Sequence, residues 1–266
     1  MMDLFNILLP ALLIGLMVSV VHTPLGIEVL KRGIIFIDLA IAQIAGLGYI
    51  STEKFVQSTH IHSGHGHTEN IFSWVTLIPS LGALSFALIS GLIFRFIEKN
   101  FTEQLEAWIG VFFVLAASLS ILILSNNPHG DEELKQLMSG QILFTTVRDV
   151  KLYLPFCIWI AAAWLMLPSL RKGLGFYFMF ALTITATVQL IGIYVVFASL
   201  ILPALVTFGK SKPLLYAWLF SAASMLMGIG FSALIDAPTG PMIVTTYVIF
   251  GILITLTNWA IQMKRE

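Results

Sequence analysis

The longest apolar block of the chain reads "LGFYFMFALTITATVQLIGIYVVFASLILPALVTF" and covers residues 174–208. At a rise of about 1.5 Å per residue, one straight helix of this length would far exceed the roughly 30 Å hydrocarbon core of a bilayer. Pro203 lacks a backbone N–H and breaks or kinks a helix. We therefore predict a membrane span over 174–195, followed by a broken or re-entrant helix over 196–208. Such a piece must be buried in protein or line a cavity.

The whole composition is that of a membrane protein. Of the 266 residues, 58% are hydrophobic and 11% are charged, and the mean hydropathy is +0.94, whereas a soluble domain has about 25% charged residues. The other apolar blocks lie at about 4–22, 33–51, 71–97, 107–125, 150–168, 213–235 and 241–262. We predict an all-α polytopic membrane protein, with about eight transmembrane helices plus one broken or re-entrant half-helix, in a single domain over residues 1–266.

Several classes of function find no support in the sequence. Lys+Arg and Asp+Glu both total 14, so no basic stripe is available to neutralise nucleic-acid phosphates. No GxxxxGK[ST] loop is present, so the chain is not expected to hydrolyse ATP itself. The absence of HExxH and GxSxG argues against an intramembrane hydrolase. We expect a protein that is not an enzyme.

The distribution of basic residues predicts an orientation. Lys31 and Arg32 follow the first apolar block, and no positive residue precedes it. The positive-inside rule then places this loop in the cytoplasm and the N-terminus outside. On this topology the polar segments 52–70 and 126–146 face outward. The count over all loops, six positive residues inside against eight outside, does not support the assignment, which depends on the first helix.

Four polar side chains in or beside the spans are candidate pathway residues: Asp38, Gln43, Gln189 and His22. An ionisable residue inside a span is a functional candidate, because it must face a cavity or a partner, although Asp38 also lies close enough to Gly33 to sit at the membrane edge. Gln43 is about 140° from Asp38 around a helix. The amide of Gln189 needs partners, and His22, at the end of the first block, is either a polar cap or a pathway residue.

The outward segments carry two further predictions. The stretch "STHIHSGHGHTEN" (58–70) contains His60, His62, His65 and His67, and short His-rich tracts often bind zinc. Gly64 and Gly66 make a rigid site less favourable, so we favour transient zinc capture over a plain polar linker. In 126–146, the spacing of Leu134, Leu137, Met138 and Ile142 predicts a short amphipathic helix in the membrane interface.

Four stretches together resemble one family. They are "HTPLGIEVLKRGIIFIDLAIAQIAGLG" (22–48), "PHGDEELKQLMSGQIL" (128–143), "IYVVFASLILPA" (193–204) and "FSALIDAPTGP" (231–241). In this order they resemble the metal-uptake permeases of ABC transporters, which move zinc, manganese or iron(II). The resemblance implies a fold like that of the vitamin-B12 importers, a permease dimer in the bacterial inner membrane, a cytoplasmic ATPase, and a periplasmic or lipoprotein metal-binding protein.

The chain departs from the family pattern in two places. Family members usually carry an Asp and a His four residues apart in the second span, but here Ala42 follows Asp38 at that distance, with Gln43 beside it. Gln is a poor zinc ligand. The connection that usually contains an ATPase-docking helix is here only "PSLRKGLGF" (168–176). Either another cytoplasmic loop, such as 95–106, contacts the ATPase, or coupling to ATP is absent.

The predicted function is that of a permease subunit for divalent metal uptake by alternating access, with zinc the favoured ion and manganese or iron(II) as alternatives. The metal is cargo, and we expect no permanently bound cofactor. The short 168–176 connection motivates the alternative of an ATP-independent transporter driven by an ion gradient.

Overall fold

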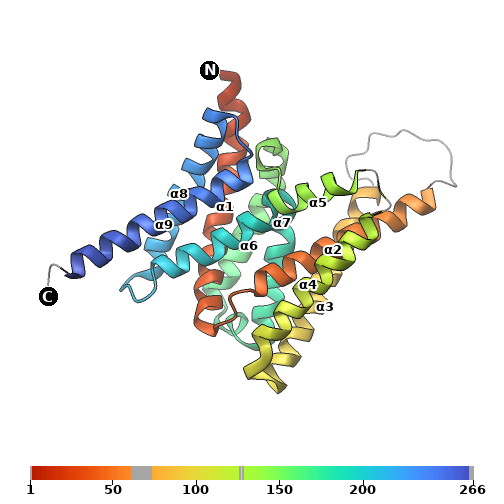
Figure 1. Ribbon diagram of the computed structural model, residues 1–266, viewed down its shortest axis with the longest axis horizontal. Helices are drawn as coiled ribbons and strands as arrows, with labels where there is room; N and C mark the ends of the chain where they lie inside the picture. Colours follow the sequence, from red (N-terminus) through yellow and green to blue (C-terminus); the bar gives the residue numbers. More distant parts are fainter. Residues whose placement is uncertain (1, 61–73, 126, 128, 264–266) are drawn as a thin grey trace. The chain divides into compact units, whose positions relative to one another are not determined.

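The computed structural model describes residues 2–60, 74–125, 127 and 129–263, and the regular elements of this part of the chain are all helices, joined by turns and short irregular segments (Figure 1). The described helices are α1 (Met2–Arg32), α2 (Ile37–His60), α3 (Trp74–Asn100), α4 (Leu105–Leu124), α5 (Gly130–Ser139), α6 (Val147–Met166), α7 (Gly173–Val206), α8 (Pro213–Ile235) and α9 (Thr239–Met263). Short 3-10 helices η1 (Thr102–Gln104), η2 (Ile142–Phe144) and η3 (Pro168–Arg171) lie between them. The predicted all-α architecture is confirmed.

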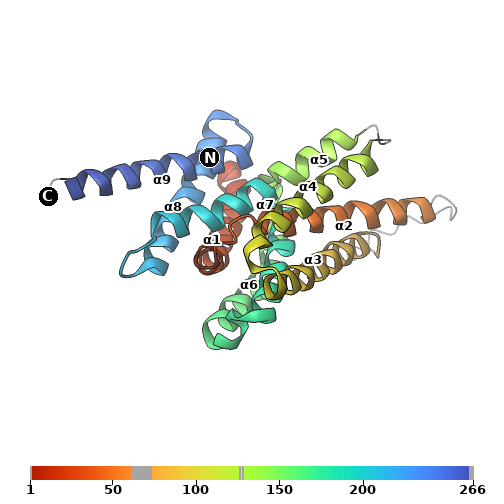
Figure 2. The ribbon, with the colours of Figure 1, turned by 60° about the horizontal axis from the view of Figure 1, so that its bottom comes forward.

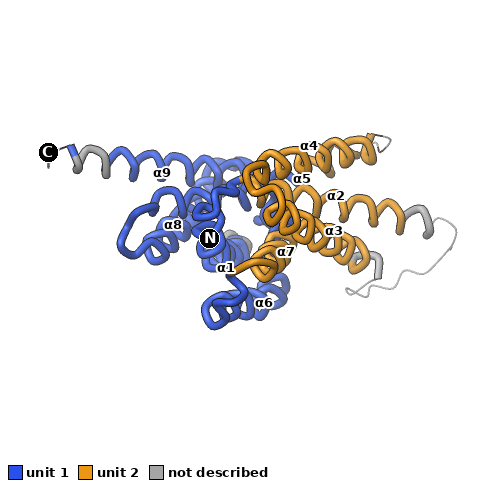
Figure 3. The backbone as a smooth tube through the Cα atoms, turned by 90° about the horizontal axis from the view of Figure 1, so that it is seen from below, with its two compact units in different colours: residues 1–35, 136–171, 187–266 blue, residues 36–135, 172–186 orange. Residues whose placement is uncertain are grey.

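The chain forms two compact units (Figure 3). Unit 1 contains residues 1–35, 136–171 and 187–266, and unit 2 contains residues 36–135 and 172–186. Helix α7 therefore begins in unit 2 and ends in unit 1.

In unit 2, α2 lies side by side with both α3 and α4 (Figures 1 and 2). Small residues bring α2 and α3 together: a Cβ atom on Gly48 would lie 2.7 Å from the carbonyl oxygen of Gly82. Small residues allow such a close helix approach.

The C-terminal part of α2 is joined to the start of α5 by charged groups. Lys54 Nζ lies 3.7 Å from Glu133 Oε1, and the Asn127 amide donates to the same oxygen at 2.5 Å. Burial raises the pKa of Glu53, and the neighbouring Glu133 raises it further against the opposing effect of Lys54. These contacts anchor the predicted helix of the 126–146 segment, which is present as α5.

The helix in the 126–146 segment is shorter than its apolar pattern suggested. It ends at Ser139, because Gly140 has a φ of 69°, and Ile142 lies buried in η2 instead of on the face of α5. A glycine in the left-handed region is a common helix terminator. The position of α5 in a membrane interface stays a prediction.

In unit 1, α1 packs against α8 and α6, and α8 packs against α9. The indole N–H of Trp218 in α8 donates to the Val20 carbonyl of α1 at 3.1 Å. Helix α1 continues to Arg32, so the expectation that the first span ends at His22 was wrong. Although Pro24 lies inside the helix, the Thr23 hydroxyl donates to the Ser19 carbonyl one turn before it at 2.6 Å.

Helix α7 is interrupted, as the length of its apolar block predicted. The break lies at Gly192, with φ 77° and ψ 162°, three residues before the end of the span predicted over 174–195. Pro203, which was expected to break or kink the chain, lies inside the second segment, and the helix continues past it to Val206. The φ and ψ angles of Gly192 are accessible only to glycine.

The break is packed against Gly140, and the residue before that glycine, Ser139, is packed against Gly240. A Cβ atom on Gly140 would overlap the backbone of Ile191 and Gly192, and one on Gly240 would overlap the Ser139 carbonyl. The Gln141 N–H donates to the Leu190 carbonyl at 3.2 Å, which pairs a group that the interrupted helix leaves free. The turn at Gly140 and Gln141, which we call the elbow after α5, therefore supplies a hydrogen bond that α7 cannot make within itself at the break.

Seven helices of the described chain are long and apolar enough to cross a membrane. Their ranges are Leu8–Arg32, Leu77–Asn100, Thr102–Leu124, Val147–Met166, Gly173–Val206, Pro213–Ile235 and Thr239–Thr257. These correspond to seven of the eight predicted blocks. Helix α2 falls below the hydropathy of the others, because it contains Asp38, Gln43 and the polar stretch after Ile50.

The glycine contact at the break gives a stability prediction. Gly140→Ala should destabilise the protein by about 1–3 kcal/mol or more, because the residue combines positive φ with backbone overlap. Gly230→Ala in α8 is the matched control: nothing lies within 4 Å of its Cβ position, and alanine in a helix interior gains up to about 1 kcal/mol. Thermal unfolding in detergent measures both variants, and a Gly140→Ala protein as stable as wild type would contradict the described contact.

Candidate functional site

Asp38 is a buried carboxylate with no ion-pair partner among the described residues. It lies in the first turn of α2, after the turn at Gly33, and its side chain is 0% exposed. The backbone N–H groups of Leu39 and of Asp38 itself lie near the carboxylate, yet neither oxygen has a hydrogen-bond partner among the described residues. A buried carboxylate is costly unless it is protonated or paired with a cation. Burial in this environment therefore favours either a protonated Asp38 or one that binds a cation.

The ion pairs of the described residues do not supply that partner. They join Arg32 to Glu28, Lys54 to Glu133 and Arg95 to Glu98. None of them includes Asp38. The side chain of Asp38 is completely buried, and both its place on a transport pathway and its place at the membrane edge stay predictions.

Two further buried polar groups in unit 2 lack partners. Both the amide nitrogen and the amide oxygen of Gln43 are unpaired among the described residues, and so is the hydroxyl of Thr185. Thr183, by contrast, donates to the Met179 carbonyl, as threonines in apolar helices usually do. Sequence reasoning missed Thr185, because a threonine that bonds to its own helix and one that does not look alike in a sequence.

His22 has a different environment from Asp38. It is fully buried in unit 1, its Nδ1 lies 2.7 Å from Ser199 Oγ, and its Nε2 lies 3.0 Å from Thr187 Oγ1. Both ring nitrogens are thus occupied. The side chain is neither a helix cap nor, in this arrangement, an open ligand.

The other predicted residues are less informative. Gln189 is exposed on α7. His62, His65 and His67 lie outside the described residues, as does the side chain of His60. Among the described residues, no group of three or more His, Cys, Asp or Glu side chains is arranged to hold a metal ion. The zinc-capture hypothesis for 58–70 therefore stays a prediction.

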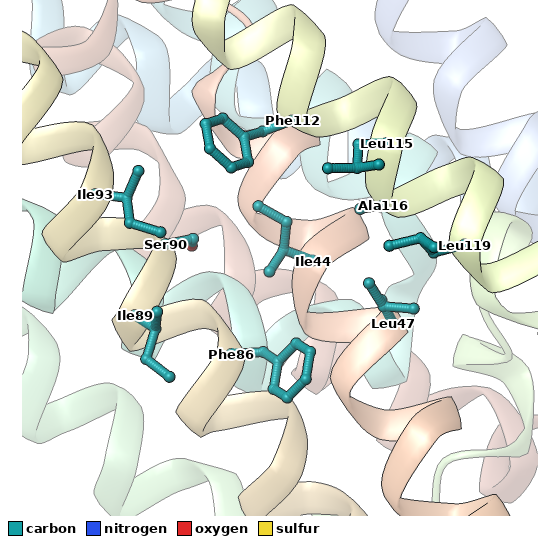
Figure 4. A pocket seen from close by; sticks show the side chains of 10 residues that line it. All are labelled: Ile44, Leu47, Phe86, Ile89, Ser90, Ile93, Phe112, Leu115, Ala116 and Leu119. Atoms are coloured by element: carbon teal, nitrogen blue, oxygen red, sulfur yellow. The ribbon is translucent and has the colours of Figure 1, made fainter.

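Unit 2 contains an apolar groove of about 270 Å³ between α2, α3 and α4 (Figure 4). Its walls include Ile44 and Leu47 of α2, Phe86 of α3 and Phe112 of α4. Ser90 is the polar residue among those that line the groove, and its hydroxyl donates to the Ala87 carbonyl at 2.7 Å. The groove offers no free ligand to a cation, so the candidate site is Asp38 and not this cavity.

The connection between α6 and α7 is short and tied to its surroundings. Residues Pro168–Arg171 form η3, and α7 begins at Gly173. The Arg171 guanidinium donates from Nε to the Trp164 carbonyl at 2.8 Å, and Arg32 donates to the Arg171 carbonyl at 2.6 Å. The connection between α6 and α7 is thus as short as the sequence of residues 168–176 predicted.

Several membrane-length helices, one of them interrupted against protein, define a polytopic membrane protein, and the buried Asp38 in it has no partner among the described residues. Comparison with known proteins gives the family: the model of the ABC 3 transport family matches residues 4–172 and 160–258. The chain belongs to this family, which confirms the predicted resemblance, and it is a multi-pass protein of the inner membrane.

Individual relatives are distant but extensive. The chain is 24% identical over 212 residues to the "Chelated iron transport system membrane protein YfeD" of Yersinia pestis, covering 70% of each chain. It is 22% identical over 265 residues to the "High-affinity zinc uptake system membrane protein ZnuB" of Haemophilus influenzae, covering 91% of this chain and 94% of the relative. The solved structure of PsaBC from Streptococcus pneumoniae in complex with Fab is 19% identical, has a TM-score of 0.65, and matches 94% of this chain and 91% of that one. This last likeness supports the fold.

Proposed function

We propose that the chain is the permease subunit of an ABC transporter for divalent metal uptake, and that Asp38 is a station for the metal on the transport pathway. The observation that carries the proposal is the pair of buried, unpartnered carboxylate oxygens of Asp38. A divalent cation would supply the missing charge, and carboxylate oxygen is a ligand that such ions accept. The relatives named for iron and zinc systems support the same class of cargo.

Zinc is the favoured cargo, because four imidazoles lie within residues 58–70 and imidazole suits zinc. Gln43 provides an amide in place of the histidine that the family resemblance implies. Transport would proceed by alternating access, in which the Asp38 site opens first to one side and then to the other. Gln43, Gln189 and His22 were the other candidates on this route, and only Gln43 shares with Asp38 a buried, unpartnered side chain.

The proposed partners are a cytoplasmic ATPase, an external metal-binding protein and a second permease chain. Family membership supports the ATPase. Because η3 is short and held by Arg171, we assign ATPase contact to the connection between α3 and α4, where Phe101 and η1 are exposed. A gradient-driven transporter is the weaker alternative, and metal uptake into vesicles without nucleotide would favour it.

The Asp38 station predicts a loss of transport that metal concentration does not rescue. Asp38→Asn keeps the size of the side chain but removes the charge that attracts the cation, so uptake of radioactive zinc should fall at least about tenfold, the factor for 1.4 kcal/mol. Asp131→Asn, which makes the same change at an exposed carboxylate in the first turn of α5, should transport normally. Normal uptake by Asp38→Asn would remove this residue from the pathway.

The histidine-rich loop predicts a concentration-dependent effect. Replacing His60, His62, His65 and His67 by Ser should lower uptake when zinc is scarce and leave uptake at high zinc nearly unchanged, because a capture site raises only the local supply. His129→Ser, which removes an exposed histidine elsewhere, is the matched control. If the fourfold variant transports normally at all zinc concentrations, residues 58–70 are a linker.

The partner assignment is tested by purification. The permease should co-purify with the ATPase encoded beside its gene, and Phe101→Glu should weaken that association because it places a charge on the proposed contact. Phe144→Glu is the matched control, because it makes the same change at an exposed aromatic residue in η2, outside the proposed contact. Equal recovery of ATPase with the Phe101 and Phe144 variants would reject the assigned surface.

A further inference from the structure

His22 contacts both segments of the interrupted helix α7. Thr187, which accepts or donates at His22 Nε2, precedes the break at Gly192, and Ser199, at His22 Nδ1, follows it. One imidazole of α1 thus connects the two sides of a discontinuity that the α7 backbone does not bridge by itself. All four residues belong to unit 1.

Each ring nitrogen of His22 faces one hydroxyl group. Ser199 Oγ lies within hydrogen-bond distance of both Nδ1 of His22 and the Val196 carbonyl, at 2.7 Å and 3.0 Å. A neutral imidazole has one N–H donor and one acceptor nitrogen, and the tautomer decides which hydroxyl donates. In either tautomer the ring can donate on one side of the break and accept on the other.

Close packing beside the bridge holds α1 against the second segment of α7. Gly26 lies one turn after His22 on the same face of α1, and a Cβ atom there would overlap the carbonyl of Leu200, the neighbour of Ser199. The side chain of His22 and the missing side chain of Gly26 thus fix the same short stretch of α7.

We propose that His22 is a positioning residue: its imidazole sets the orientation of the two α7 segments across Gly192 during transport, and it does not ligate the metal. This inference rests on the proposed transport function. A ligand would need a free ring nitrogen, whereas both nitrogens of His22 are engaged by hydroxyl groups. Its role is therefore distinct from that of Asp38, whose oxygens are unpartnered.

The test compares uptake of radioactive zinc or manganese by cells that contain the whole transporter, normalised to folded permease in the membrane. His22→Leu, Ser199→Ala and Thr187→Val should each lower the maximal rate, His22→Leu by about tenfold, because each removes a contact of the bridge across Gly192. The metal concentration at half-maximal rate should change less than about twofold, the scale of a few tenths of a kcal/mol. The His22→Leu/Ser199→Ala double variant should be little worse than His22→Leu, because the two residues share one interaction.

Conservative and control variants separate positioning from ligation and from folding alone. His22→Gln retains a donor and an acceptor and should transport faster than His22→Leu. Thr207→Val and Ser120→Ala, which remove buried hydroxyls bonded only to backbone carbonyls, should transport normally. The proposal is overturned if His22→Gln and His22→Leu are equally impaired with a raised half-saturating concentration, or if the rate per folded permease is unchanged. Loss of transport in Asp38→Asn with normal His22 variants would leave the proposed function standing and reject this inference alone.

Discussion

The backbone contact between the α7 break and the elbow after α5 is the constraint on which unit 1 depends. Gly192 and Gly140 approach so closely that neither can carry a side chain, and the Gln141 N–H pairs with a carbonyl at the end of the first α7 segment. Without this pairing, the break would leave unpaired peptide groups in an apolar environment, which is costly in a membrane. The four stretches that carry the family resemblance meet here: Ser139 contacts Gly240, and His22 and Gly26 contact the second α7 segment.

His22 and Asp38 are both buried ionisable residues, but their surroundings suit them to different functions. The imidazole of His22 is satisfied on both sides and can hold helices together without a charge. The carboxylate of Asp38 is unsatisfied, and in a dry interior it requires a proton or a cation. The permease proposal depends on this contrast, because a transport station must be free to bind and release its cargo.

Much of the fold could be predicted from apolar periodicity and block length. The excess length of residues 174–208 indicated a broken helix, and Asp38 was identifiable as an acid within an apolar stretch. Pro203 was the local signal for a break and led to a boundary between 195 and 196, whereas the observed break at Gly192 packs against Gly140, about fifty residues earlier in the chain. The partners of His22 are separated from it by 177 and 165 residues, so spacing alone could not show that its nitrogens are occupied.

The most direct test of the central claim is a structure of the complete transporter determined with zinc or manganese present. Our account predicts metal density beside the Asp38 carboxylate, at about the 2.0–2.2 Å expected for zinc and carboxylate oxygen, with loss of that density in Asp38→Asn. A structure in which a Lys or Arg side chain of this chain or a partner pairs with Asp38, and metal binds elsewhere in the membrane, would contradict it.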